Sequence, residues 1–328
     1  MDGVNGKTTL ARMPIPTAAE RSADPVPIRA NPYLLATLPP LFWAGNFILG
    51  RAVHHTIPPI ALSFWRWALA LLILLPFAWT RLRSQRETLR RHWAVLCLLA
   101  VLGVTNYNTF AYIGLQTTTA TNAALLVSVT PILILVLSFL LLNQPIGLRQ
   151  AAGILISLAG AAVIVVRGDL GALAAMRLSG GDLWILAAVG SWALYSVCLR
   201  WRPAELDALA FLAATTALGL IPLVPLYSWE LDQGLGFQPN LATLGAIGYV
   251  ALFPSGLAYV LWNRVVAQLG ANRTGQFLHL VPAFGALLAM PLLGERLYPF
   301  HLAGIGLIAA GIVVATRGAL GRQGPTAR

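Results

Sequence analysis

The sequence predicts an all-α integral membrane protein with ten transmembrane helices, arranged as two inverted five-helix repeats. Three observations support this prediction. Of the 328 residues, 58% are hydrophobic and only 10% are charged, with a mean hydropathy of +0.74. Soluble domains carry about 25% charged residues, so a soluble fold would lack the polar surface to cover so many apolar side chains. The chain also contains ten apolar stretches of membrane-crossing length, and its second half repeats a pattern of the first.

Each predicted span meets the requirement of about 20 mostly apolar residues for crossing a bilayer. Most connections between the spans are short, which makes consecutive helices antiparallel neighbours. The longer polar links are 80–92 and 229–240. The expected spans are 33–52, 59–79, 93–114, 119–142, 149–167, 182–200, 207–228, 241–268, 272–293 and 300–316.

The internal repeat is visible as proline and glycine matches at a constant offset. An odd number of spans in each copy makes the second copy enter the membrane from the opposite face. Inverted repeats of this kind are typical of secondary transporters, in which a site between the halves opens alternately to each side. The matches are Pro131/Pro282, Gly153/Gly304 and Gly160/Gly311 at an offset of 151, and Trp43-Ala44/Trp192-Ala193 and Arg51/Arg200 at an offset of 149.

The repeats define the domain organisation. The polar, proline-containing segment 1–30 is expected to be a disordered cytosolic tail without a cleavable signal. The remaining parts are a first repeat at 31–168, a linker at 169–181, a second repeat at 182–317 and a cytosolic tail at 318–328.

The distribution of Lys and Arg predicts the orientation. When the link 80–92 is placed in the cytosol, sixteen of the 22 basic residues fall on the cytosolic side and four on the outer side. This bias follows the positive-inside rule and places both termini in the cytoplasm. The net charge of +11 is therefore explained by membrane topology, and no nucleic-acid partner is expected.

No cofactor, metal site or catalytic residue is expected. Cys97 and Cys198 both lie in apolar runs without disulfide or metal-ligand spacing. The segment Gly3–Thr8 resembles the end of a phosphate-binding loop, but it lacks the first glycine and the preceding strand that such a loop needs.

Several motifs resemble the EamA-type branch of the drug/metabolite transporter superfamily over residues 33–316. One departure is Asn143-Gln144, where the second half has Gly294-Glu295. The resemblance implies a ten-helix carrier of amino acids, nucleotide-like metabolites or small drugs in the plasma membrane, which is the inner membrane of bacteria. Ala258-Tyr259 and Trp262-Asn263 are most similar to the aromatic amino acid exporters. The motifs are Leu41–Phe47, Phe64-Trp65-Arg66-Trp67, Leu293–Leu297 and the glycines from Gly304 to Gly311.

Polar and aromatic side chains within the spans are the candidate substrate-binding residues. Polar groups in a bilayer tend to face the bundle interior or a watery cavity. We therefore expect a central cavity lined by spans 1, 3, 4, 6, 8 and 9, in which amides bind a zwitterion and aromatic rings hold an apolar or cationic body. The candidates are Trp43, Asn46, Tyr107, Asn108, Tyr112, Trp192, Tyr195, Tyr259, Trp262, Asn263, Gln276 and His279.

Each of these assignments has an alternative. The tryptophans are equally compatible with helix packing, and the asparagines with interhelical hydrogen bonds that have no substrate role. Arg66 either extends to the membrane surface or binds a substrate carboxylate or a backbone carbonyl. His279 is either a structural hydrogen-bonding group or a proton relay. Pro131 and Pro282 are candidate hinges.

Small residues in spans 5 and 10 predict close helix packing, as in Ser157-x-x-x-Ala161 and Gly306-x-x-x-Ala310. These helices are interpreted as packing helices within the chain or between two copies in a homodimer.

The predicted function is transport of small organic metabolites, above all aromatic or neutral amino acids or related amphiphilic drugs, by alternating access. Acidic residues are expected only outside the spans: Asp182 and Asp207 at edges, Glu230 in the outer link and Glu295 in an outer loop. Because a buried carboxylate is a common proton relay, we expect an exporter or facilitator with weak ion coupling. The alternatives are an integral membrane enzyme, disfavoured by the acid-poor spans and short loops, and a channel-like pore.

Overall fold

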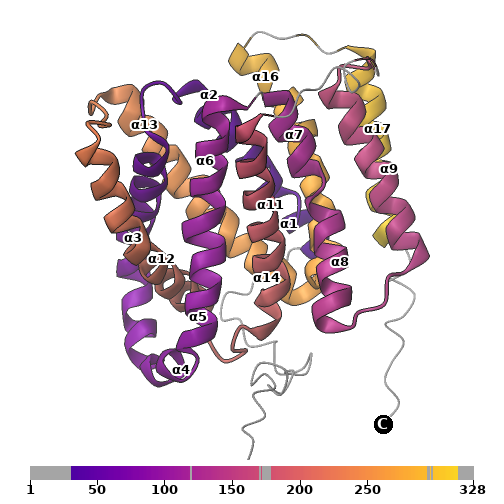
Figure 1. Cartoon of the computed structure of the whole chain (residues 1–328). Coiled ribbons are helices and arrows are strands. Elements are labelled where there is room, and N and C mark those ends of the chain that lie inside the picture. Colours follow the sequence, from indigo (N-terminus) through magenta and orange to yellow (C-terminus); the bar gives the residue numbers. More distant parts are fainter. Residues whose placement is uncertain are drawn as a thin grey trace, which may run out of the picture.

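The computed structural model describes residues 31–118, 120–169, 171, 179–293, 296 and 298–316. These residues form a bundle of long helices, and the described part contains no β-strand (Figure 1). The predicted tails 1–30 and 318–328, most of the linker 169–181 and Glu295 lie outside the described residues.

The first half of the chain follows the predicted order of spans. Span 1 contains α1 and α2, span 3 contains α5, η3 and α6, and span 4 contains α7 and α8. The elements are α1 (Pro32–Leu35), α2 (Leu38–Ala52), α3 (Pro59–Ser84), α4 (Arg86–Arg91), α5 (Trp93–Ala100), η3 (Val101–Asn106), α6 (Tyr107–Thr117), α7 (Ala120–Ser128), α8 (Thr130–Leu142) and α9 (Leu148–Val165).

The second half has the matching composition. Span 8 contains α13, η5 and α14, and span 9 contains α15, η6 and α16. The elements are α11 (Gly180–Cys198), η4 (Leu199–Trp201), α12 (Ala208–Asp232), α13 (Leu241–Val250), η5 (Ala251–Leu257), α14 (Ala258–Leu269), α15 (Ala271–Gly275), η6 (Gln276–His279), α16 (Leu280–Leu293) and α17 (Pro299–Thr316).

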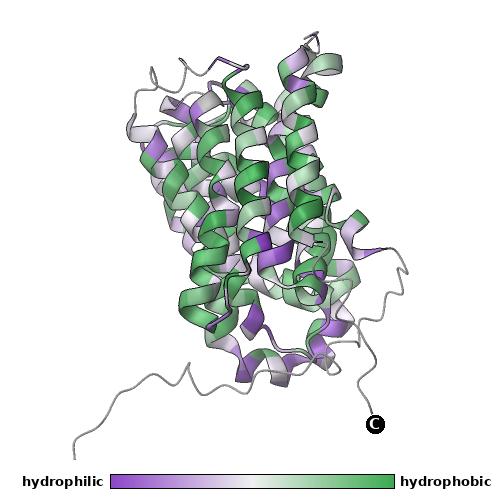
Figure 2. Cartoon of the chain, turned by 90° about the vertical axis from the view of Figure 1, so that its right-hand side faces the viewer, coloured by the Kyte–Doolittle hydropathy of each residue, from purple (hydrophilic) through white to green (hydrophobic). Residues whose placement is uncertain are grey.

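The helices have the length and composition that a bilayer requires. Among the described residues, nine helical segments are long and apolar enough to cross a membrane. The tenth predicted span, 272–293, is formed by α15, η6 and α16 in succession. Figure 2 shows hydrophobic residues along the length of the helices, with hydrophilic residues concentrated at the lower end and others within the bundle. The prediction of an all-α, multi-pass membrane protein is confirmed.

The predicted ends of two spans have to be corrected. α3 continues to Ser84 instead of ending at 79. α12 continues to Asp232 instead of ending at 228, which places Glu230 in its last turn and not in a loop. The Glu230 side chain is buried and accepts hydrogen bonds from the backbone nitrogens of Ile60 at 3.0 Å and Ala61 at 2.6 Å. The first N–H groups of a helix have no partner within the helix, and a carboxylate satisfies them well. Glu230 therefore anchors the beginning of α3.

The backbone irregularities also repeat. η3 and η5 are both π-helical and occupy equivalent positions of spans 3 and 8 at the offset of 151. Spans 4 and 9 are interrupted just before Pro131 and Pro282, since α7 ends at Ser128 and η6 ends at the equivalent His279. Near the beginning of a helix, proline removes no intrahelical hydrogen bond. The predicted hinge prolines therefore follow equivalent breaks in the two halves.

Several residues touch their own counterpart in the other repeat. Such a contact requires both residues to lie on the two-fold axis that relates the copies. A pseudo-two-fold axis therefore runs through the middle of the bundle, as the inverted repeat predicts. The pairs are Asn108 Nδ2 and Tyr259 Oη at 3.3 Å, His279 Nε2 and the Ser128 carbonyl oxygen at 3.0 Å, Ser157 Oγ and the Ile308 carbonyl oxygen at 3.2 Å, and the rings of Trp43 and Trp192 at 4.9 Å.

The packing of α9 against α17 depends on glycine. A Cβ atom added to Gly153 would lie 2.5 Å from the carbonyl oxygen of Gly311. One added to Gly160 would lie 2.6 Å from the carbonyl oxygen of Gly304. The two contacts are symmetry equivalents, because Gly153 matches Gly304 and Gly160 matches Gly311 at the offset of 151. The two helix backbones touch, and no larger residue fits between them.

The small-residue motifs give a mixed result. Ser157 and Ala161 are buried, as the packing prediction requires. Ala310 is exposed, and no atom lies within 4 Å of the Cβ position of Gly306. The helix-packing prediction was therefore right for α9 and wrong for this face of α17 within one chain. The face lies open to lipid or to another molecule.

Replacing Gly311 by leucine should separate α9 from α17, because its Cβ would lie 2.5 Å from the carbonyl oxygen of Gly153. We expect a loss of about 1–3 kcal/mol of stability, typical of overpacking. The matched control is Gly306→Leu on the same helix, which adds the same side chain in open space. Melting temperatures of the purified variants in detergent test this prediction, and equal values for Gly311→Leu and Gly306→Leu would contradict it.

Candidate functional site

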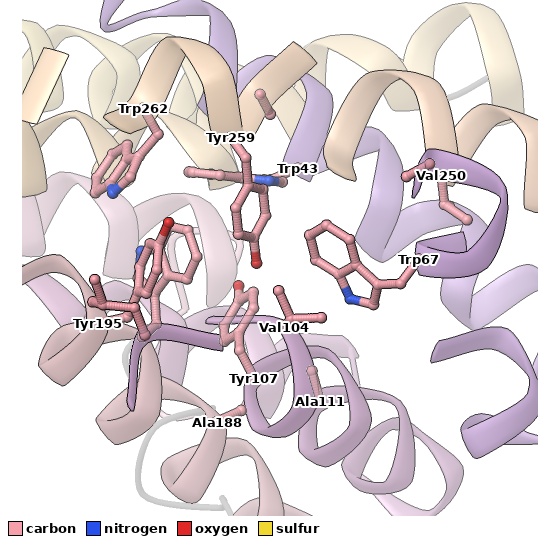
Figure 3. Packing of buried hydrophobic residues seen from close by; sticks show 14 of the residues in the cluster. Trp43, Trp67, Val104, Tyr107, Ala111, Ala188, Tyr195, Val250, Tyr259 and Trp262 are labelled. Atoms are coloured by element: carbon pink, nitrogen blue, oxygen red, sulfur yellow. The ribbon is translucent and has the colours of Figure 1, made fainter. Parts of the chain in front are cut away.

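Seven aromatic side chains from five helices meet at the centre of the bundle, and we call them the central aromatic cluster. Trp192 is their hub: its ring centroid lies 4.8 Å from that of Tyr107, 5.1 Å from Tyr195 and 5.3 Å from Tyr259. Figure 3 shows the hydroxyl groups of Tyr107 and Tyr259 pointing toward one another. All members are buried. The cluster consists of Trp43, Trp67, Tyr107, Trp192, Tyr195, Tyr259 and Trp262.

The π-helical segments position this cluster. π-Helical turns often mark functional sites, because they re-aim the side chains that follow. Tyr107 directly follows η3, and Tyr259 lies just beyond η5. The Tyr259 hydroxyl donates to the carbonyl oxygen of Gly103, inside η3, at 2.5 Å. A Cβ on Gly103 would lie 2.6 Å from the Tyr195 ring, so this approach needs glycine.

The predicted aromatic residues thus come together, but they fill the centre instead of lining an open cavity. None of them lines either of the pockets described below. In this conformation the middle of the bundle is closed by the central aromatic cluster.

Arg66 lies beside the cluster and is fully buried. Its Nε donates to Ser255 Oγ at 2.7 Å. Its Nη1 donates to Asn108 Oδ1 at 2.7 Å, Asn46 Oδ1 at 3.1 Å and Tyr112 Oη at 2.5 Å. Arg66 therefore does not extend to the membrane surface, and that alternative was wrong. Its partners are neutral side-chain oxygens, not the backbone carbonyl that was also considered.

The same polar pair occurs on both sides of the axis. Tyr112 donates from its hydroxyl to Asn46 Oδ1 at 2.7 Å, and Tyr195 donates to Asn263 Oδ1 at 2.7 Å. Asn46 matches Tyr195 at the offset of 149, and Tyr112 matches Asn263 at 151. The two pairs are therefore equivalent, with the residue types exchanged.

Arg66 breaks this symmetry. Its counterpart at the offset of 149 is Thr215, whose hydroxyl donates to the Phe211 carbonyl oxygen of its own helix at 2.9 Å. One side of the pseudo-two-fold axis thus contains a buried guanidinium, and the equivalent position on the other side does not.

Several buried donors in and around the central aromatic cluster, and one in η6, have no hydrogen-bond partner among the described residues. A buried donor without a partner costs free energy, which is why such groups often mark a site for water or a ligand. These donors come from both repeats. They are Arg66 Nη2, Trp67 Nε1, Trp192 Nε1, Trp262 Nε1, Asn263 Nδ2 and Gln276 Nε2.

Two pockets lie on either side of the centre. The larger, which we call the Arg51 pocket, has a volume of about 440 Å³. The smaller, the Arg200 pocket, has a volume of about 80 Å³. Four lining residues of one match four of the other at the repeat offsets, so the pockets are symmetry equivalents. The matched pairs are Phe47/Ser196, Ile48/Val197, Arg51/Arg200 and Leu115/Val266.

The pockets are at opposite ends of the bundle. α3 begins seven residues after Ala52 of the Arg51 pocket and runs about 39 Å, at 1.5 Å per residue. At its far end, Arg81 lies 3.4 Å from Asp207, and Gln85 donates to the carbonyl oxygen of Glu205 at 2.8 Å. Residues 203 and 204 line the Arg200 pocket. The link 80–92 and the segment 200–206 therefore share one end.

The remaining predicted residues have separate locations. Asn263 lines the Arg200 pocket, and Pro282 lines the Arg51 pocket. Gln276 and His279 are buried in η6, where His279 contacts its own counterpart, Ser128.

The pocket arginines were missed as site residues. Arg51 donates from Nη1 to the carbonyl oxygen of Leu115 at 2.9 Å and lines the larger pocket. The match of Arg51 with Arg200 was visible in the sequence, but the fact that each lines a pocket was not. Within the described part of the chain, no group of three or more His, Cys, Asp or Glu side chains is placed to hold a metal ion.

Comparison with known proteins decides the family. The sequence pattern of the EamA-like transporter family matches residues 31–166 and 179–317. The chain belongs to the EamA-like transporter family. This confirms the resemblance found in the sequence motifs.

Relatives within the family carry transporter names. The "Uncharacterized transporter YyaM" of Bacillus subtilis is 26% identical over 286 residues, covering 87% of this chain and 93% of that protein. An "Uncharacterized transporter" of Archaeoglobus fulgidus is 29% identical over 298 residues, covering 88% and 98%. A "Probable terminal-alkyne amino-acid exporter" of Streptantibioticus cattleyicolor is 28% identical over 243 residues, covering 73% and 78%. These names indicate a membrane transporter.

A solved structure shares the fold. It is titled only "Crystal structure of protein", and it superposes with a TM-score of 0.70 at 20% identity, covering 89% of this chain and 99% of that one. At this identity the likeness extends to the fold alone.

Proposed function

We propose that this EamA-family protein is a carrier that moves small organic metabolites across the membrane by alternating access. The observation that carries the proposal is the pair of symmetry-equivalent pockets, 440 Å³ and 80 Å³ in volume, on opposite sides of a closed centre. In proteins with inverted repeats, each half can adopt the conformation of the other half. When the two halves swap conformations, a protein open at one face becomes open at the opposite face. This conformation is then the state open at the Arg51 pocket.

Spans 4 and 9 supply the moving parts in this proposal. Ala123 and Val127 of α7 line the Arg51 pocket, whereas Leu142 of α8 lines the Arg200 pocket. In span 9, Pro282 lines the first pocket and Ala271 the second. Each span is interrupted between its two lining parts, at the break before the predicted hinge proline. Bending at both breaks would widen one pocket as the other narrows.

Amino acids, aromatic or neutral, are the substrate class that we assign, with related amphiphilic drugs as secondary substrates. The amide and hydroxyl pairs suit a zwitterion, and the central aromatic cluster suits an apolar body. The amino-acid exporter name of the Streptantibioticus relative supports this choice. The positive-inside bias supports a cytoplasmic location of the Arg200 pocket and of both termini. We therefore assign export across a plasma membrane, the inner membrane in bacteria.

Filling the Arg51 pocket should block transport without unfolding the protein. Gly285 lines this pocket, and no atom lies within 4 Å of its Cβ position. We expect Gly285→Leu to fold normally and to lose most counterflow of labelled L-phenylalanine or L-leucine in proteoliposomes. Gly306→Leu, which adds the same side chain on the outer face of α17, should retain it.

Counterflow also tests the alternatives. A channel-like pore gives flux without saturation or counterflow, and an enzyme gives chemical change of the substrate. If the wild-type protein shows no counterflow of any amino acid, or if Gly285→Leu and Gly306→Leu behave alike, the assignment of the carrier pathway is wrong.

Proton coupling should be weak. In the described spans, the two buried carboxylates are engaged at helix ends: Glu230 anchors α3, and Asp182 accepts hydrogen bonds from Thr118, Asn122 and Ser179 at the beginning of α11. A pH gradient alone should therefore not drive uphill accumulation of amino acids into proteoliposomes. Accumulation above the equilibrium level under a pH gradient would contradict this expectation.

A further inference from the structure

We propose that Arg66 binds the carboxylate of the transported solute, so that the substrates are amphiphilic carboxylates and not amines lacking an acid group. The inference rests on the proposed carrier function and specifies which chemical group the centre recognises.

The first argument is the uncompensated charge of Arg66. The guanidinium is fully buried, and its hydrogen-bond partners are the neutral oxygens of Asn46, Asn108, Tyr112 and Ser255. No carboxylate in the described part of the chain forms an ion pair with it. Removing a charge from water costs several kcal/mol, and an oppositely charged partner is the usual compensation. An ionised group within the membrane is accordingly a candidate for ligand binding.

The second argument is the free hydrogen-bonding capacity of the same group. Arg66 Nη2 is buried and has no partner among the described residues. Guanidinium binds carboxylate through two parallel hydrogen bonds, which require two nitrogens. Nη2 supplies one, and Nη1 supplies the other when a substrate oxygen replaces that of Asn46 or Tyr112. The displaced Tyr112 and Asn46 still have each other as partners.

The third argument is the position of Arg66 beside the central aromatic cluster. Its Cζ atom lies 5.5 Å from the centroid of the Trp67 ring, and Trp67 lies 4.9 Å from Tyr259. A solute with its acid group on Arg66 would therefore have its apolar body among the aromatic rings. This matches the division of an aromatic or aliphatic amino acid into a charged head and an apolar side chain.

The fourth argument is the sign of charge along the pathway. The charged side chains that line the two pockets are arginines: Arg51 and Arg167 in one, Arg200 and Arg202 in the other. Among the described residues, neither lining includes Asp or Glu. Such a pathway attracts anionic groups and disfavours a solute whose only charge is positive.

A structural role for Arg66 is the competing explanation, because its bonds connect α2, α3, α6 and η5. Both roles predict damage when Arg66 is removed. They differ in selectivity: a structural residue affects all ligands equally, whereas a carboxylate-binding residue affects only ligands that carry the acid group.

The test uses matched ligands that differ at that group. Full-length protein in detergent is assayed by thermal shift with L-phenylalanine, L-leucine and their carboxamides, and in proteoliposomes by counterflow of the same four compounds. A ligand that binds the folded state raises the melting temperature. For the wild type, we expect the free acids to stabilise the protein and to exchange, and the carboxamides to do neither.

In Arg66→Gln, the affinity for the free acids should fall by about tenfold or more, because the variant loses the charge-assisted hydrogen bonds to the carboxylate. Arg66→Lys should keep the preference for acids with weaker binding. The matched control is Arg83→Gln, which removes an arginine from the last turn of the same helix α3 and should behave like the wild type.

Equal responses of the wild type to acids and carboxamides would overturn the inference, even if Arg66→Gln cannot be purified. So would a parallel loss of binding for both ligand types in Arg66→Gln. Exchange of carboxamides but not of acids would overturn it while leaving the carrier function intact. Absence of exchange for all four compounds would contradict the inference and the proposed function together.

Discussion

The pseudo-two-fold axis between the two repeats is the constraint on which the rest of this structure depends. It forces certain residues to meet their own counterparts, and these meetings occupy the centre: Trp43 against Trp192 and Asn108 against Tyr259. It also forces α9 and α17 together through glycines that exchange under the symmetry. The two pockets follow from the same axis, because any hollow at one end must have an equivalent at the other.

The hydrocarbon environment explains how polar groups are used around that axis. Polar groups there have no solvent to bond, so hydrogen bonds must be formed within the protein. The equivalent Tyr–Asn pairs, Tyr112 with Asn46 and Tyr195 with Asn263, meet this requirement in both halves. Arg66 meets it only in part: among the described residues, no carboxylate pairs with its charge and no acceptor bonds to its Nη2. At Arg66 the two halves differ and the hydrogen bonds are incomplete. Substrate recognition is therefore expected at this residue.

Much of the fold could be predicted from the sequence, because span length and repeat offset are one-dimensional properties. The offsets of 149 and 151 also identify which residues are equivalent in the two halves, whereas only the structure shows which of these pairs meet on the axis. Other features depend on three-dimensional packing. Arg66 lies close enough to a span end to reach the surface, and only the surrounding Asn46, Asn108 and Tyr112 show that it turns inward. Glu230 was assigned to the polar outer link 229–240, yet it lies in the last turn of α12 and anchors the beginning of α3. The difference in volume between the two pockets depends on side-chain packing and has no sequence signal.

The most direct test of the central claim is whether the two pockets open reciprocally. In a protein with Cys97 and Cys198 replaced by alanine, cysteines are introduced as Ile48→Cys and Val197→Cys, two equivalent positions that line opposite pockets. A bulky maleimide is attached at position 48, and the labelling rate at position 197 is then measured by mass spectrometry. If the pockets are alternative openings of one pathway, holding the first open should slow labelling at the second. An unchanged rate would show that the pockets are independent and would contradict alternating access.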